Sequence, residues 1–280
     1  MEDGNITFAK MEWIPQLKQI WKECFHDEDS YIDFYFMKRF TEENMLVWLE
    51  DKLPVAMASL LPCTCWEKKN GLLLKQPVRY IYAVATKPGF KGQGISTKLM
   101  KYIQSFLDQN HEIGILVPAE ESLISFYGKR NFHPAIRAKE RVNDEAERFE
   151  LQISSLSDIL IKEGPVLAKK YKQIRDSWLG MDGYIEWDED AIDYAIKENL
   201  LIGGLCFEMI CEGESHIIMG YIDKEQFIVR ETTLSEHQWD QYAMTIANEF
   251  ECSRILQKER FFMSTRKNWA KTSYFNLALD

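Results

Sequence analysis

The segment from Tyr82 to Ser96 combines residues that could bind an anion. It reads YAVATKPGFKGQGIS, an apolar run followed by Gly89, Gly92 and Gly94 and then by a helical pattern. Glycine loses more backbone entropy on folding than any other residue, so this spacing indicates that the backbone itself is used. The first turn of a helix leaves N–H groups without partners, and the helix dipole adds positive potential there. The segment therefore predicts a phosphate-binding loop.

The expected ligands of this phosphate are the backbone N–H groups of Gln93, Gly94, Ile95 and Ser96, helped by the side chains of Lys91 and Ser96. A P-loop would need lysine after its second glycine, where this chain has Ile95. A dinucleotide fingerprint would need a third glycine at Thr97. The sequence therefore matches neither of these two nucleotide-binding motifs.

A third motif fits this loop. Lys91-Gly92-Gln93-Gly94-Ile95-Ser96 resembles the coenzyme-A-binding motif of the GNAT acetyltransferase superfamily, (Arg/Gln)-x-x-Gly-x-(Gly/Ala), which follows a strand and a proline such as Pro88. Lys91 replaces Arg or Gln, and Ser96 replaces Gly or Ala. The later segment Phe126-Tyr127-Gly128-Lys129-Arg130-Asn131-Phe132 resembles a second motif of that family. The resemblance runs from about Ile6 to Ile136.

The resemblance implies an N-acetyltransferase that moves an acetyl group from acetyl-CoA directly to a primary amine of a small molecule or peptide. The pantetheine of the coenzyme would lie between strands 80–86 and 113–117, beside Val84, Ala85 and Thr86. The backbone N–H of Val84 or a neighbour would polarise the thioester carbonyl. Tyr127 would face the coenzyme sulfur and stabilise it as it leaves.

The general base is harder to assign. Strand residues 80–84 carry no carboxylate, so Tyr82 or a chain of waters would have to accept the proton of the amine. Glu120, Glu121, His26 and Asp27 stay open as alternatives. The missing acid also leaves open a non-catalytic protein that senses acyl-CoA or acts as a scaffold.

Apolar periodicity predicts an α/β (α+β) protein. The resemblance implies the GNAT fold, in which helices flank a mixed, mostly antiparallel sheet. Helices are expected at 11–25 and 31–40, the second beginning with a capping box of Ser30 and Asp33. Strands follow at 45–49, 55–61, 63–66, 72–74 and 78–86. After the loop come a helix from Ile95, a strand at 113–117 and a helix at 122–129.

The charged stretch 138–148 places a domain boundary near its end, giving an acetyltransferase domain at 1–145 and a second domain at 146–280. The second half repeats part of the order, with strands at 149–153, 201–210, 216–222 and 226–232 and helices at 166–178, 188–198 and 236–251. Ser235 and Gln238 form a capping box that closes the last of these helices to a phosphate. We therefore expect a GNAT-like domain without a coenzyme site. The apolar tail 274–280 is expected to dock, and its carboxylate is a further candidate base.

Composition excludes several classes of protein. The chain has 280 residues and six cysteines. Its net charge of -10 argues against binding to nucleic acid or to a membrane surface. It lacks a signal peptide, an apolar run long enough to span a membrane, and ligand spacing for a metal. A cytoplasmic protein with reduced thiols is expected. Its oligomeric state stays open, with a homodimer as one alternative.

Overall fold

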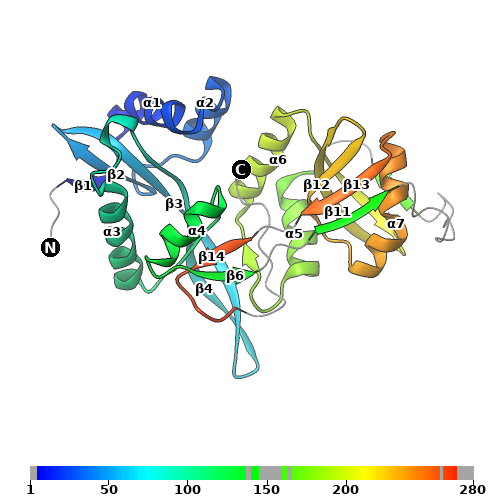
Figure 1. Ribbon diagram of the computed structural model, residues 1–280. Helices are drawn as coiled ribbons and strands as arrows, with labels where there is room; N and C mark the ends of the chain where they lie inside the picture. Colours follow the sequence, from blue (N-terminus) through cyan, green and yellow to red (C-terminus); the bar gives the residue numbers. More distant parts are fainter. Residues whose placement is uncertain (1–4, 137–139, 145–158, 163–165, 259–260, 270–280) are drawn as a thin grey trace. The chain divides into compact units, whose positions relative to one another are not determined.

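The computed structural model describes residues 5–136, 140–144, 159–162, 166–258 and 261–269 (Figure 1). These residues divide into two compact units. The first contains the described residues up to Ile136 together with the segment that begins at Phe261. The second contains the described residues between those two segments.

A mixed sheet forms the centre of the first unit, with the strand order β1-β2-β3-β4-β5-β14-β6. Its strands are β1 (Ile6–Phe8), β2 (Met45–Glu50), β3 (Leu53–Lys69), β4 (Leu72–Thr86), β5 (Ile113–Leu116), β6 (His133–Ile136) and β14 (Phe262–Ser264). Strands β2, β3 and β4 form the predicted antiparallel meander, and β4 pairs with β5 in parallel. Pro62 does not split β3 as expected, because it lies beyond the residues of β3 that pair with β2.

Helices cover both faces of this sheet (Figure 1). They are α1 (Ile14–Phe25), which follows the 3-10 turn η1 (Met11–Trp13), then α2 (Asp29–Lys38), α3 (Ile95–Asn110) and α4 (Glu121–Gly128). Leu99 and Ile103 of α3 pack with Leu60, whereas Trp21 of α1 packs against Tyr82 on the opposite face. The two faces of the sheet therefore present different helices to any ligand that lies between β4 and β5.

The predicted capping box at Ser30 and Asp33 is wrong. Helix α2 begins at Asp29, and its N-cap residue Glu28 makes no side-chain capping bond. Ser30 lies inside the helix, and the carboxylate of Asp33 instead accepts a hydrogen bond from Lys18 of α1 at 2.8 Å. The side chain of Asp33, which the predicted capping box needed, thus forms an ion pair with another helix instead.

A β-bulge distorts β4 just before the glycine loop. Met57 of β3 lies opposite Ala85, whereas Ser59 lies opposite Tyr82, so β4 carries one extra residue between these pairs. Ala83 lies in this bulge with a φ of 51°, in the left-handed region that residues with a side chain rarely adopt. The bulge bends the strand and redirects the residues that follow.

The second unit has its own mixed sheet, in the strand order β7-β13-β12-β11-β10-β8. The strands are β7 (Glu140–Asp144), β8 (Ile159–Lys162), β10 (Leu205–Cys211), β11 (Glu214–Asp223), β12 (Gln226–Thr232) and β13 (Arg254–Lys258). The unit also contains α5 (Ala168–Leu179), the short strand β9 (Ile185–Glu186), α6 (Glu189–Leu201) and α7 (Glu236–Glu249). Trp239 and Tyr242 of α7 are buried against Phe227 and Ile255 of the sheet.

A buried ion pair joins α5 to β12 in this unit. Arg175 and Glu231 are fully buried, and the Nε atom of Arg175 lies 3.0 Å from a carboxylate oxygen of Glu231. Tyr171 donates a hydrogen bond of 2.7 Å to the other oxygen of that carboxylate. A buried charge is tolerated when its hydrogen bonds are satisfied, as they are here.

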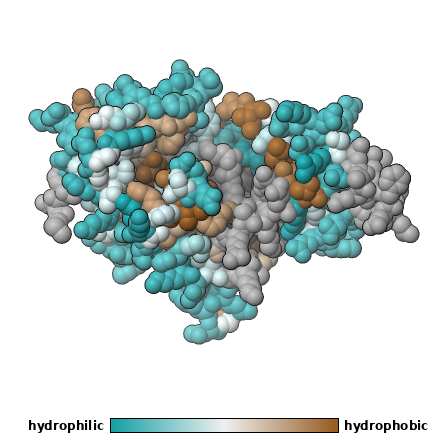
Figure 2. Space-filling view, in the orientation of Figure 1, coloured by the Kyte–Doolittle hydropathy of each residue, from teal (hydrophilic) through white to brown (hydrophobic). Residues whose placement is uncertain are grey.

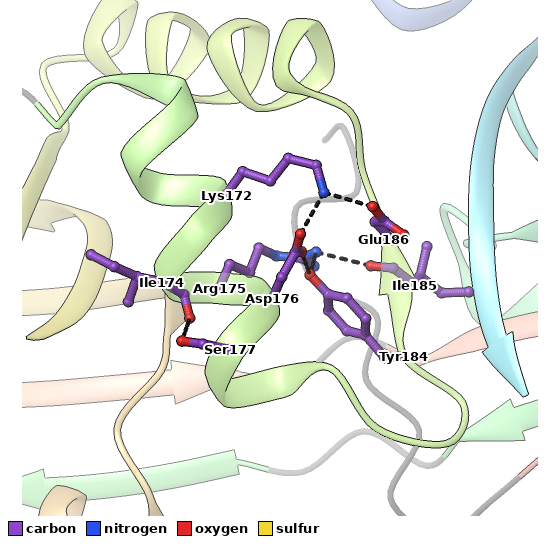
Figure 3. Close-up of polar contacts among 8 residues, drawn as sticks. All are labelled: Lys172, Ile174, Arg175, Asp176, Ser177, Tyr184, Ile185 and Glu186. Carbon is purple, nitrogen blue, oxygen red and sulfur yellow. Dashed lines mark hydrogen bonds and ion pairs between the residues drawn. The ribbon is translucent and has the colours of Figure 1, made fainter. Parts of the chain in front are cut away.

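The same arginine also reaches the segment that follows α5, as Figure 3 shows. Arg175 donates to the hydroxyl of Tyr184 at 2.6 Å and to the carbonyl of Ile185 at 2.9 Å. Lys172, one turn earlier, bridges Asp176 and Glu186. This polar cluster fixes the position of α5 and the chain after it.

Two segments differ from the division predicted at residue 145. Strand β7 pairs with β13 of the second unit, and β14 pairs with β5 and β6 of the first. Each strand is short, and each pairs with a strand far away in the sequence. The strand expected at 149–153 and the tail 274–280 lie outside the described residues.

Hydrophilic residues cover most of the surface seen in Figure 2, with separate hydrophobic patches between them. No helix in the part of the chain that the structure describes is long and apolar enough to cross a membrane. The six cysteines all lie in the described residues, and none of them forms a disulfide bond there.

The bulge gives a first prediction. Replacing Ala83 with valine should lower the free energy of unfolding by about 2 kcal/mol, because a β-branched residue is strained at positive φ. Replacing it with glycine, which adopts positive φ freely, should change that free energy by less than about 1 kcal/mol. Urea unfolding of both variants measures this, and equal losses in the two would contradict a left-handed Ala83.

Candidate functional site

The parallel strands β4 and β5 separate near the bulge. Their pairing runs only from Val78 opposite Ile113 to Tyr80 opposite Ile115, although β4 continues to Thr86. At the paired end, the Nε atom of Arg79 lies 3.0 and 2.9 Å from the two carboxylate oxygens of Glu112. Beyond Tyr80, the edge of β4 that faces β5 has no strand partner among the described residues. The two strands therefore form a fork that is closed at one end.

The glycine loop lies at the end of β4, after the 3-10 turn η2 (Pro88–Phe90). Gly92 and Gly94 have φ values of 81° and 78°, and a Cβ added at either would meet no atom within 4 Å. The glycines are thus needed for their backbone conformation, and the space above them is open. Gly89 has no such φ, so only two of the three glycines meet the expectation of a backbone use.

The loop leads directly into α3. Gly94 is its N-cap residue, no side chain caps the helix, and its first turn contains no acidic residue. The first backbone bond into the helix is from the N–H of Lys98 to the carbonyl of Gly94, at 3.0 Å. The N–H groups of the preceding residues, Ile95 and Ser96 among them, therefore face the open loop with the positive end of the helix dipole behind them.

Side chains tie this loop to the end of β4. The hydroxyls of Thr86 and Ser96 lie 3.0 Å apart. The thiol of Cys24 on α1 donates to the carbonyl of Thr86 at 3.3 Å, and burial raises the pKa of that thiol while Lys91 opposes the rise. Ala85 and Thr86 are buried, while Lys91 and Gln93 are exposed. Hydrogen bonds thus connect the end of β4 at Thr86 both to Ser96 at the start of α3 and to α1.

Tyr127 lies on the α3 and α4 side of the fork. Its ring packs edge-on against Phe126 and Phe132, in the same cluster as Ile81 of β4 and Leu116 of β5. Val84 packs against this cluster too. Burial raises the pKa of the Tyr127 phenol to about 12, and the Arg130 guanidinium opposes that rise. This hydroxyl is therefore a hydrogen-bond donor over the whole physiological range of pH.

Arg130, which carried no role in the sequence prediction, links α4 to the first turn of α3. Its guanidinium carbon lies 3.5 Å from the ring centroid of Phe126, and it donates to the carbonyl of Phe126 and to the hydroxyl of Thr97. The second family motif and the glycine loop are therefore joined through one cation. Nothing in the local pattern signals this contact, because it spans 33 residues.

Tyr82 lies on the other side of the fork. Its hydroxyl is 3.1 Å from the hydroxyl of Tyr31 on α2, and its ring contacts those of Trp21, Tyr35 and Tyr80. Sequence reasoning missed Tyr31, because α2 was expected to begin at that residue and its side chain had no assigned partner. The structure therefore places Tyr82 and Tyr127 on opposite faces of the sheet.

The other candidate bases lie between α1 and α2 and at the start of α4. Asp27 accepts a hydrogen bond from the indole nitrogen of Trp21 at 2.7 Å. Glu120 accepts one from Ser122 at 2.5 Å, and Glu121 is exposed in the first turn of α4. His26 ends α1 in a left-handed conformation with a φ of 63°. Among the described residues no group of three His, Cys, Asp or Glu side chains could hold a metal ion.

The start of α7 in the second unit contrasts with that of α3. The N–H of Gln238 donates to the hydroxyl of Ser235 at 3.2 Å, and the N–H of Ser235 donates to the side chain of Gln238 at 3.0 Å. This confirms the predicted capping box. The protein's own side chains thus satisfy N–H groups at this helix start.

Comparison with known proteins agrees with the fork and loop of the first unit. Residues 5–135 match the family model described as Acetyltransferase (GNAT) domain. No curated protein sequence matches the chain.

Solved structures share the fold at low sequence identity. A GCN5-related N-acetyltransferase from Anabaena variabilis is 17% identical with a TM-score of 0.72, over 92% of this chain and 71% of that one. A conserved protein of unknown function from Enterococcus faecalis, a probable N-acyltransferase, is 13% identical with a TM-score of 0.70, over 92% and 71% of the two chains. A GCN5-related N-acetyltransferase from Kribbella flavida is 12% identical with a TM-score of 0.67, over 92% and 70%.

The matched domain covers the residues that form the fork and the glycine loop. Residues 5–135 are therefore similar to the GNAT acetyltransferases.

The loop gives a second prediction. Replacing Gly94 with alanine should lower the free energy of unfolding by about 1 kcal/mol, because an L-residue is strained in the left-handed region. Replacing Gly89 with alanine should leave it unchanged, since Gly89 lacks positive φ and its surroundings are open. Urea unfolding compares the two, and an equal effect would contradict the described loop conformation.

Proposed function

We propose that this protein transfers an acetyl group from acetyl-CoA directly to a primary amine of a small molecule or peptide while both are bound. The observation that carries the proposal is the uncapped start of α3 at Gly94, placed at the open end of the β4 and β5 fork. A pyrophosphate would fit the uncapped start of α3, and an extended pantetheine chain would fit the fork between β4 and β5.

The coenzyme would be held mainly by backbone groups. The N–H groups of Gln93, Gly94, Ile95 and Ser96 would bind its phosphates, with Lys91 and the Ser96 hydroxyl adding charge and a donor. Other lysines near the loop have partners of their own. Lys98 lies over the ring of Trp48 at 4.9 Å, and Lys87 lies 3.8 Å from the carboxylate of Glu23.

The unpaired edge of β4 would orient the thioester. Past Tyr80, an N–H on this edge, from Val84 or a neighbour, would donate to the thioester carbonyl and stabilise the charge that develops on its oxygen. The bulge at Ala83 turns this part of the strand, so it positions that donor. Attack by the neutral amine would then form the C–N bond of the amide while the C–S bond breaks. The coenzyme would leave as the thiolate, and the second proton of the nitrogen would pass to solvent.

Tyr127 would stabilise the leaving sulfur. A thiol has an ordinary pKa of about 8.5, far below the value of about 12 to which burial raises the pKa of Tyr127. Transfer of the phenol proton to the thiolate is therefore strongly uphill. The geometry supports hydrogen-bond donation by a phenol that keeps its proton, as required for stabilising a thiolate.

The second unit would be a GNAT-like domain without a coenzyme site. Its strands β10, β11 and β12 form an antiparallel meander, β12 pairs in parallel with β13, and α7 connects that parallel pair, as α3 connects β4 and β5. The pairing of β12 with β13 ends at Val229, just before a bulge at the position of Arg230. This repeats the arrangement of the first unit around Tyr80 and Ala83.

Charged pairs occupy the equivalent place in the second unit. Arg230 lies 3.0 Å from Glu198 of α6, with side chains that are 10% and 4% exposed. Glu231 follows it and pairs with Arg175. Together with the capped start of α7, these pairs support a domain that has a GNAT-like strand arrangement but fills the coenzyme position with its own side chains.

An assay of coenzyme release tests the proposed activity. The protein is mixed with acetyl-CoA and alkylamines, amino sugars or peptides, and the free thiol is followed with a disulfide reagent while mass spectrometry identifies the acetylated product. We expect thiol release that depends on the amine. Binding of acetyl-CoA without transfer to any amine in the panel would instead support a sensor or scaffold.

The role of Tyr127 gives a third prediction. Tyr127→Phe should lower kcat by about 10- to 100-fold, because it removes a donor that acts on the developing thiolate. The affinity for acetyl-CoA should change by less than about threefold, since the ring that lines the cluster is kept. With the wild type, the rate should not fall through loss of the Tyr127 proton below about pH 11, because the folded-state pKa is raised to about 12. Unchanged kcat in the variant would remove Tyr127 from the mechanism.

A further inference from the structure

We infer that the paired hydroxyls of Tyr31 and Tyr82 form the subsite for the acceptor, that this subsite takes a protonated alkylamine, and that the pair carries the proton of the amine to solvent. The inference rests on the proposed acetyl transfer and adds to it the charge state of the substrate and the route of its proton.

The position of the pair relative to the fork is the first argument. Tyr82 lies two residues beyond Tyr80, where pairing with β5 ends, and directly before Ala83 in the bulge. It lies on the α1 and α2 face, opposite the cluster that contains Tyr127. An amine beside Tyr82 would therefore approach a thioester in the fork from one side, and Tyr127 would donate to the leaving sulfur from the other side.

The hydroxyl contact is the second argument. The two phenol oxygens lie 3.1 Å apart and are partly buried, so one donates its proton to the other. A hydroxyl has one proton to donate and two lone pairs to accept. A pair of hydroxyls can thus accept a proton at one oxygen and release another proton from the second.

Aromatic rings give this subsite an affinity for cations. The ring of Trp21 lies 5.8 Å from that of Tyr82 and 6.3 Å from that of Tyr31, measured between centroids. Its indole nitrogen is held by Asp27, which fixes the orientation of the ring. Trp21 is itself buried, so it supports the two tyrosine rings from within the core. The faces of the partly exposed rings of Tyr31 and Tyr82 are the ones that attract an ammonium group.

The turn beside the pair is acidic. Asp27 and Glu28 connect α1 to α2, and Asp29 is the first residue of α2. Lys22 lies 3.1 Å from Asp29 and donates to the carbonyl of Asp27, so it offsets part of this charge. With a net charge of -10 on the chain, the field near the turn favours a cationic amine over an anionic one.

The proton step needs no carboxylate. An alkylamine has a pKa of about 10.4, so only about one molecule in a few thousand is neutral at pH 7. The ammonium N–H gives its proton to the Tyr82 oxygen, the Tyr82 proton moves to the Tyr31 oxygen, and the Tyr31 proton leaves to water. Both tyrosines end neutral, and the nitrogen gains the lone pair that attacks the thioester carbon.

Tyr35 offers a matched control from the same aromatic cluster. Its ring lies 5.7 Å from that of Tyr82, but its hydroxyl is fully buried and donates to Ser59 at 2.7 Å. Burial raises the pKa of Tyr35 to about 12. Loss of this hydroxyl removes a core hydrogen bond and leaves the Tyr31 and Tyr82 pair in place.

The experiment compares two amines of different basicity on the full chain. One is a primary alkylamine, protonated at pH 7, and the other is an aromatic amine or hydrazide that is already neutral. Each is tested with Tyr31→Phe, Tyr82→Phe, the double variant and Tyr35→Phe. Acetyl-CoA affinity and thermal unfolding are measured for every variant.

We expect kcat/KM for the alkylamine to fall by about 10- to 100-fold in each single variant and by no more in the double variant, since the two hydroxyls act as one unit. The neutral amine should change by less than about threefold, and Tyr35→Phe should leave both substrates unaffected. Equal losses for both amines, or additive losses in the double variant, would overturn the proton route. A wild type that acetylates no amine would instead remove the proposed function itself.

Discussion

The early end of pairing between β4 and β5 is the constraint on which the rest of the site depends. Parallel strands normally continue side by side, but here the ladder stops at Tyr80 and the bulge at Ala83 turns the remaining residues of β4. Among the described residues, β4 therefore continues past the end of its ladder with β5, and a different set of helices lies on each face of the sheet there. Tyr127 and Tyr82 lie on opposite faces of the sheet, which is the basis of the different roles that we propose for them. The strained backbone of Ala83 is thus part of the site's construction.

The two helix starts that follow a parallel-paired strand differ in how their first N–H groups are satisfied. At α3, Gly94 supplies a left-handed turn and leaves the first N–H groups open. At α7, Ser235 and Gln238 bind those groups themselves. The parallel pair of the second unit also ends at a bulge, where Arg230 and Glu231 form ion pairs with Glu198 and Arg175. The order of strands β2 to β5 thus matches that of β10 to β13, whereas the two helix starts differ in their capping residues.

Local patterns predicted much of this structure, and contacts distant in sequence account for what they missed. The meander, α3, β12 and the capping box at Ser235 follow from periodicity and short motifs, which act within a few residues. The capping box at Ser30 failed because Lys18, on another helix, attracts Asp33. The contacts of Tyr31 with Tyr82 and of Arg130 with Thr97 join residues 51 and 33 positions apart, and no local pattern encodes them. The pairing of β14 with β5 is of the same kind.

Hydrogen exchange at the two helix starts, with and without acetyl-CoA, tests the central claim most directly. The claim is that open N–H groups at the start of α3 hold the coenzyme phosphates and that the capped start of α7 does not. Mass spectrometry of peptides covering residues 91–98 and 235–241 should show slower exchange in the first peptide on binding and no change in the second. Unchanged exchange at 91–98 in the presence of bound coenzyme would contradict the claim, as would equal protection of both peptides.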